Sequence, residues 1–89
     1  MEHIACAFGF GKAWDGEYQL IKLDHWSNAA GTYWIYHDSS FWYISDSEYC
    51  FDNEHVMARK PFGDRGSWID GTYEGVNGQP NGYIKLGTC

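Results

Sequence analysis

The stretch Tyr33-Trp-Ile-Tyr-His-Asp-Ser-Ser-Phe-Trp-Tyr-Ile-Ser-Asp46 decides the fold of this chain. Two runs of aromatic and β-branched residues, which favour strands, flank the turn formers Asp38-Ser39-Ser40. The pattern predicts a β-hairpin. With Asp38-Ser39 as a two-residue turn, four pairs would lie opposite one another: Tyr36 and Phe41, Ile35 and Trp42, Trp34 and Tyr43, and Tyr33 and Ile44.

Both faces of the predicted hairpin are apolar, because side chains alternate across a strand and nearly every position carries a ring or an aliphatic group. Burial of one face in a core does not explain the second. The second apolar face is therefore the main functional clue in the chain. One face would carry Tyr33, Ile35, Trp42 and Ile44, and the other would carry Trp34, Tyr36, Phe41 and Tyr43.

Length and composition indicate a single small β-rich domain, residues 1–89. A chain of 89 residues buries only about 60–65% of its unfolded surface, so its core is small. The chain has 5 Trp, 7 Tyr and 5 Phe, which is more aromatic surface than such a core needs. Its 11 Gly and 2 Pro fit short strands joined by tight turns. We therefore predict an all-β fold, a small antiparallel β-sandwich or half-open barrel of about six to eight short strands.

Strand signals recur along the whole chain. Apolar or alternating runs bounded by Gly, Pro, Asn or Asp are typical of strands, and Asp70-Gly71 is a favoured two-residue hairpin loop. Residues 24–30 are predicted to form a loop, and the acidic segment 46–54 is predicted to be mostly loop. The expected strands are 3–8, 17–23, 33–36, 41–46, 55–59, 67–69, 72–74 and 82–86.

The charge of the chain argues against nucleic acid as a ligand. The formal net charge is −6, with 6 Lys and Arg, whereas nucleic-acid binders carry a basic patch that displaces counterions. An acidic protein rich in aromatics can instead mimic nucleic acid in a basic groove. No apolar stretch is long enough to span a bilayer and no secretory signal is visible, so we expect no membrane partner.

The three cysteines, Cys6, Cys50 and Cys89, are an odd number at wide spacing. A disulfide framework in a small secreted domain usually has an even number of cysteines, about four or more. We therefore expect three reduced thiols and a cytoplasmic or virion-associated protein. One bridge, such as Cys6 to Cys50, remains an alternative.

The sequence predicts no enzyme, no cofactor and no metal site. His3 with Cys6, and Cys50 with His55, are zinc-type ligands, but their spacing is not that of a zinc knuckle and strand alternation would point them apart. Nothing beside Cys50 indicates an activated nucleophile or an oxyanion hole. Paired carboxylates occur in predicted turns, and a chain this short can hardly build the cleft that a glycosidase needs.

Six short motifs follow one another along about three quarters of the chain. They are Phe8-Gly9-Phe10-Gly11, Asp15-Gly16-Glu17-Tyr18, Tyr33 to Tyr36, Trp42-Tyr43-Ile44-Ser45-Asp46, Lys60-Pro61 and Trp68. Their order resembles a short β module repeated in bacterial and bacteriophage structural proteins. The chain departs from that module at 23–30, where the module usually has an Asn-Gly-x-Pro turn and a tyrosine. The resemblance implies a β module of structural or adhesive type and supplies no catalytic residues.

A second motif lies near the C-terminus. Tyr73-Glu-Gly-Val-Asn-Gly78 followed by Asn81-Gly82 is similar to one repeat of the membrane-occupation and recognition nexus type. Such repeats bury a core only when several copies stack, and one copy is present. We therefore expect a hairpin here.

The second aromatic face of the central hairpin is the candidate site. Both faces could belong to the core, with the hairpin sandwiched between two layers. Aromatic residues are also enriched at protein interfaces, and the same rings could stack on sugars. We expect a non-enzymatic interaction or structural module, of phage origin, that docks on a protein partner or forms a homo-oligomer through this hairpin. The alternatives are a small carbohydrate-binding (lectin-like) domain and an acidic phage anti-defence inhibitor. The candidate residues are Trp34, Tyr36, Phe41, Tyr43, His37 and Asp38.

Overall fold

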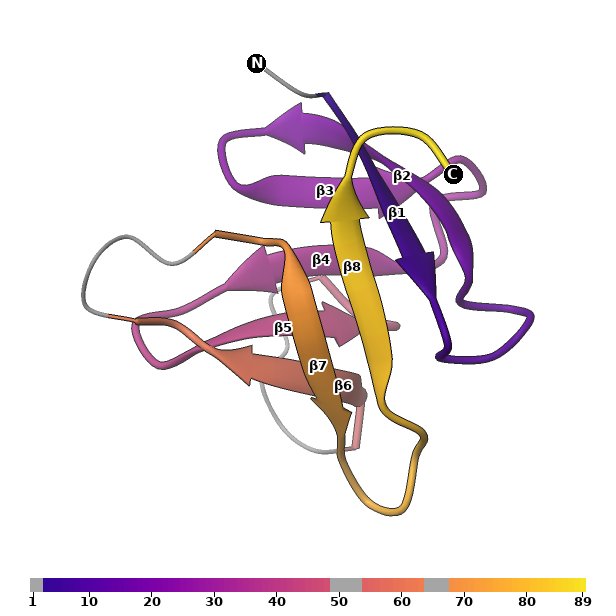
Figure 1. Cartoon of the computed structure of the whole chain (residues 1–89). Coiled ribbons are helices and arrows are strands. Elements are labelled where there is room, and N and C mark those ends of the chain that lie inside the picture. The colour runs from indigo at the N-terminus through magenta and orange to yellow at the C-terminus, as the bar shows by residue number, and fades with distance from the viewer. Residues whose placement is uncertain (1–2, 49–53, 64–67) are drawn as a thin grey trace.

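Eight antiparallel strands close into a barrel in this computed structural model, which describes residues 3–48, 54–63 and 68–89. Each strand pairs with its neighbours in the chain, and the last strand pairs with the first (Figure 1). The described residues contain no helix, and so none that could cross a bilayer. The all-β prediction is confirmed, and the barrel is fully closed. The strands are β1 (Ile4–Phe8), β2 (Gly16–Lys22), β3 (His25–Asn28), β4 (Trp34–His37), β5 (Phe41–Ser45), β6 (Val56–Pro61), β7 (Gly71–Gly75) and β8 (Gly82–Leu86).

Large rings fill the interior of the barrel. An eight-stranded barrel is just wide enough for side chains to fill it, and Tyr18, Trp42 and Tyr73 are almost completely buried. The hydroxyl of Tyr18 donates to the Trp14 carbonyl at 2.7 Å, and that of Tyr73 donates to the Ile69 carbonyl at 2.6 Å. These buried phenols are therefore satisfied. The same cluster contains Ala5, Ala7, Phe10, Trp26, Ile35, Ile44, Met57, Ala58 and Ile84.

The central hairpin forms, but its turn lies one residue further along the chain than predicted. The Asp38 amide donates to the Phe41 carbonyl at 3.0 Å, which makes Ser39 and Ser40 the turn residues. The predicted register is therefore wrong. Moving a turn by one residue shifts the pairing by two, and because side chains alternate with a period of two, every residue keeps its predicted face. The observed pairs are Trp34 with Ser45, Ile35 with Ile44, Tyr36 with Tyr43 and His37 with Trp42.

The segment predicted as a loop before the hairpin contains a strand. β3 pairs with β2 on one side and with β4 on the other. Trp26 belongs to the barrel core, and His25 is also buried. The sequence prediction missed this strand because it has only four residues and lies next to Asp24, a turn residue with a φ of +52°.

The hairpin predicted around Asp70-Gly71 is wrong. Trp68 and Ile69 do not belong to a strand, and Gly71 is already the first residue of β7. β7 pairs instead with β6 and β8. The hairpin expected over 73–82 is present, because β7 and β8 pair through Tyr73 and Gly82.

Cys6 and Cys89 form a disulfide, which corrects the prediction of three reduced thiols and of Cys6 with Cys50. β8 lies beside β1, and the tail that follows β8 curves across β1 (Figure 1). The two cysteines are 83 residues apart in the chain, so only barrel closure brings them together. Cys50 and the predictions for 49–53 and 64–67 lie outside the described residues.

Candidate functional site

A second apolar cluster lies outside the barrel core, on the other face of the central hairpin. We call it the outer aromatic cluster. It contains the face that the sequence singled out, and the residues divide between the two faces as predicted. In the structure one face fills the barrel and the other lies on its outer surface. Its members are Trp34 and Tyr36 from β4 and Phe41 and Tyr43 from β5, and they pack with Val56 and Val76.

The two tyrosines of the cluster are held inside the protein. Tyr36 is 1% exposed and its hydroxyl donates to the Ser47 carbonyl at 2.6 Å. Tyr43 is 4% exposed and its hydroxyl donates to Oδ2 of Asp38 at 2.8 Å. Burial, together with the neighbouring Asp38 carboxylate, raises the pKa of Tyr43 to about 12. Both phenols therefore hold the outer surface together and leave little ring area for a ligand.

Trp34 and Phe41 form the part of the cluster that solvent reaches. Both rings are only partly buried and pack against the two tyrosines. The guanidinium of Arg59, on the neighbouring strand β6, lies 4.3 Å from the centre of the Phe41 ring. That distance is within the range of a cation–π contact. The accessible surface thus combines two aromatic rings with one cation.

Asp38 orders the turn beside this surface. Its Oδ1 accepts hydrogen bonds from the amides of Ser40 (2.7 Å) and Phe41 (2.8 Å). Partial burial alone would raise the pKa of Asp38, but these two bonds and the one from Tyr43 outweigh it and lower that pKa. The carboxylate therefore acts as a structural acceptor for the turn.

His37 lies apart from the outer aromatic cluster. It faces Trp42, a barrel-core residue, across the hairpin, and its ring stacks on Phe62 with centroids 4.3 Å apart. Its Nε2 lies 3.1 Å from Oδ2 of Asp24. Of the six candidate residues, the structure therefore brings together Trp34, Tyr36, Phe41, Tyr43 and Asp38 and places His37 on the other face of the sheet.

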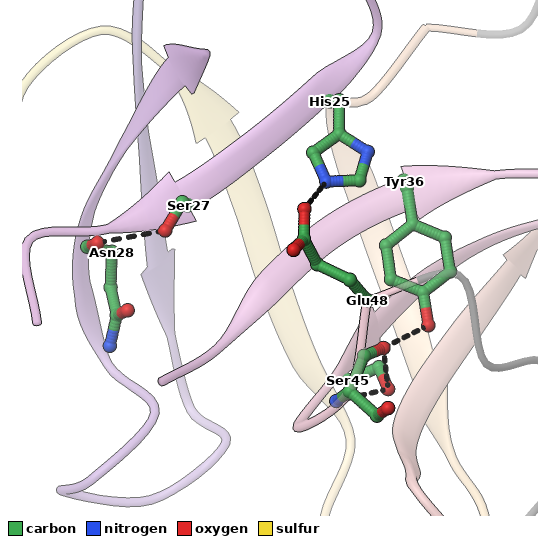
Figure 2. Close-up of polar contacts among 7 residues, drawn as sticks. His25, Ser27, Asn28, Tyr36, Ser45 and Glu48 are labelled. Carbon is green, nitrogen blue, oxygen red and sulfur yellow. Dashed lines mark hydrogen bonds and ion pairs between the residues drawn. The ribbon is translucent and has the colours of Figure 1, made fainter. Parts of the chain in front are cut away.

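Polar residues that the sequence did not single out support the cluster from β3 and from the end of β5 (Figure 2). His25 is 2% exposed, its Nε2 lies 2.8 Å from Oε2 of Glu48, and its ring stacks on Tyr36. Ser45 Oγ bonds the Ser47 carbonyl that also receives the Tyr36 hydroxyl. Had β3 been recognised, strand alternation would have placed the side chains of His25 and Trp26 on opposite faces of the sheet. With Trp26 inside the barrel, His25 would then lie outside it.

Further aromatic surface lies across the seam between β1 and β8. Phe8 is 45% exposed and Tyr83 is 39% exposed, and their rings are 5.4 Å apart. They face each other in the β1–β8 register. The sequence assigned both residues to strands but had no signal that the two strands were neighbours.

Among the described residues, no group of three or more His, Cys, Asp and Glu is placed to hold a metal ion. Comparison of the chain with protein-family models, with curated proteins and with solved structures gave no match. The fold and the site define the protein as a small closed β-barrel that carries an aromatic cluster on its outer surface.

Proposed function

We propose that this chain is a non-enzymatic structural module that assembles with a second copy of itself through the outer aromatic cluster. The observation that carries the proposal is the second apolar cluster, which lies outside the barrel core and presents the partly exposed rings of Trp34 and Phe41. A barrel of this size is already filled by its interior residues. The rings of Trp34 and Phe41 are therefore the part of the cluster that is available for contact with another molecule.

Closure of the barrel excludes assembly by strand addition and leaves assembly through side chains on the outer surface. Each of its eight strands has a partner on both sides, so the barrel offers no free edge for strand addition. Contacts must form between side chains on the outer surface. Aromatic and arginine side chains are the residues that most often dominate such interfaces, and Trp34, Phe41 and Arg59 supply both kinds.

Two copies repel one another as wholes, because each carries a net charge of −6, so a favourable contact between them must pair opposite charges locally. The chain carries twice as many acidic residues (12) as Lys and Arg (6), so a second copy offers many carboxylates to a cation. Arg59 already lies at the edge of the accessible rings. A guanidinium that stacks on an aromatic ring can still donate hydrogen bonds to a carboxylate of the partner.

The disulfide bears on where the protein works. Disulfides form and persist in oxidising surroundings and are rare in the cytosol. The bridge between Cys6 and Cys89 thus favours the virion-associated location over the cytoplasmic one. An assembling module on the outside of a particle would keep this bridge.

Size-exclusion chromatography with light scattering tests the proposal. We expect a defined oligomer for the wild type, and we expect Trp34→Ala and Phe41→Ala each to weaken assembly at least about tenfold, as for residues at the centre of an interface. Both side chains are partly exposed, so the barrel should stay folded, which circular dichroism will show. Leu23→Ala is the matched control, because Leu23 is an apolar residue 88% exposed outside the cluster.

A wild-type mass equal to one chain of 10.2 kDa would contradict self-assembly. An oligomer that both cluster variants leave intact would show that another surface carries it. If the chain is monomeric, Trp fluorescence with a saccharide panel tests the lectin-like alternative, which predicts that a saccharide changes the fluorescence. Binding to a basic protein that weakens as salt is added would support the inhibitor alternative.

A further inference from the structure

The barrel closes at a seam between its first and last strands. Four residue pairs join β1 to β8, from Ala5 with Leu86 to Phe8 with Tyr83. Every other neighbouring pair of strands is consecutive in the chain. The seam is therefore the one junction of the barrel that joins residues separated by nearly the whole chain.

The C-terminal tail fastens this seam from outside. The Gly87 amide donates to the Ile4 carbonyl at 2.7 Å, and the Cys89 amide donates to Oε2 of Glu17 at 3.2 Å. Cys89 then bonds Cys6 in the middle of β1, with the two Cα atoms 5.2 Å apart. Cys6 is buried whereas Cys89 is exposed, so a small thiol would approach the bridge from the Cys89 side.

We propose that the Cys6–Cys89 bridge is a redox lock on the seam, so that the barrel is fully closed only when the bridge is oxidised. Locking is a thiol–disulfide exchange with an oxidised disulfide such as glutathione disulfide. One cysteine thiolate forms a mixed disulfide, the second displaces it, and two glutathione thiols leave with the electrons and protons. A dithiol reductant reverses the reaction and returns two cysteine thiols.

Chain entropy explains why the seam opens first when the lock is reduced. Bringing two segments together costs more entropy as the intervening loop lengthens. The hairpins of the barrel close short loops, whereas the bridge that fastens the seam joins residues 83 positions apart. The bridge removes this cost because it already joins the ends in the unfolded chain, so reduction destabilises the whole fold and leaves the seam as the junction with the largest closure cost. The inference concerns the stability of the seam and does not depend on the proposed assembly.

Amide hydrogen exchange of the oxidised and dithiothreitol-reduced protein tests the lock, strand by strand. After reduction we expect the β1 and β8 amides to lose at least about tenfold more protection than the β4 and β5 amides, because the seam opens without global unfolding. The thermal midpoint should fall by about 10–30 °C. Cys89→Ser, a change at the exposed chain end, should reproduce both effects without reductant.

Cys50→Ser is the matched control, because it removes a cysteine and leaves the bridge in place. It should keep the oxidised exchange pattern and respond to dithiothreitol as the wild type does. Thiol counting of the wild type under denaturing conditions should give one thiol per chain before reduction and three afterwards, and for Cys50→Ser it should give none and two. Uniform loss of protection in all strands, or an unchanged exchange pattern after complete reduction, would overturn the proposal.

Discussion

At the scale of single residues, two glycines set how closely parts of the barrel approach. A Cβ on Gly82 would lie 2.6 Å from the ring of Phe10, which is 1% exposed. A Cβ on Gly75 would collide with the carbonyl oxygens of Gln79 and Pro80. Backbone cannot move aside as a flexible side chain can, so Gly75 is the stricter of the two requirements.

We predict that Gly75→Ala lowers the free energy of unfolding by about 1–3 kcal/mol, the usual cost of forcing an extra group into a packed site. Urea denaturation measures this. Gly63→Ala is the control, because no atom lies within 4 Å of a Cβ there, and it should change stability by less than about 0.5 kcal/mol. Equal effects of the two substitutions would contradict the packing seen around Gly75.

At the scale of elements, the β4–β5 turn depends on one carboxylate. One carboxylate oxygen of Asp38 accepts hydrogen bonds from the amides of Ser40 and Phe41, and the other accepts a hydrogen bond from the hydroxyl of Tyr43. These three hydrogen bonds place the turn at Ser39-Ser40 and thereby determine the register of the hairpin. The sequence predicted a turn at these residues, but local propensity could not choose between two adjacent positions.

We predict that Asp38→Ala lowers the free energy of unfolding by about 1–3 kcal/mol, because two backbone amides and the buried Tyr43 hydroxyl lose a charged acceptor. Asp38→Asn should lie between Ala and the wild type, since it keeps one acceptor oxygen. Urea denaturation checks both, with Ser39→Ala as the exposed control in the same turn.

Acid should reproduce part of this effect. The pKa of Asp38 is lowered in the folded protein, so its contribution is present above the ordinary pKa of about 3.9 and is lost as the pH falls through the folded value. Asp38→Asn should therefore lose less stability than the wild type below that pH. An identical acid dependence of the two proteins would show that the turn carboxylate does not contribute.

At the scale of the whole molecule, the barrel keeps its buried phenols neutral. Burial raises the pKa of Tyr18 and of Tyr73 well above the ordinary value of 10, and it raises that of Tyr43 to about 12. Folding thus favours the protonated form of all three. Burial lowers the pKa of Lys60, so folding favours the neutral form of this lysine. As the pH rises, this single group stabilises the folded protein and so opposes the effect of the three tyrosines.

We predict that the free energy of unfolding is steady up to about pH 10 and falls above it, because the unfolded chain then ionises tyrosines that the folded chain keeps protonated. Each such group contributes a slope of up to about 1.4 kcal/mol per pH unit. Urea denaturation between pH 9 and pH 11 measures the slope, in a Cys50→Ser background that limits thiol exchange.

Tyr43→Phe should reduce this alkaline slope relative to the wild type. The comparison uses slopes, since Tyr43→Phe also removes the bond to Asp38. A stability that does not change between pH 9 and pH 11 would contradict the buried, neutral state of the three phenols.

The sequence by itself determined the fold class, most of the strands and the division of the central hairpin into two apolar faces. These properties depend on alternation and on turn residues, which act over a few neighbouring positions. It missed β3, whose four residues are too few for a period of two to be evident beside turn formers.

Only the tertiary structure decided the closure of the barrel, the pairing of β1 with β8 and the Cys6–Cys89 bridge. It also decided which face of the hairpin fills the interior and that His37 lies apart from the outer aromatic cluster. Each of these depends on residues that are far apart in the chain and meet only when all eight strands have paired. Local sequence patterns carry no information about such long-range contacts, because the free energy of these contacts comes from closure of the whole barrel.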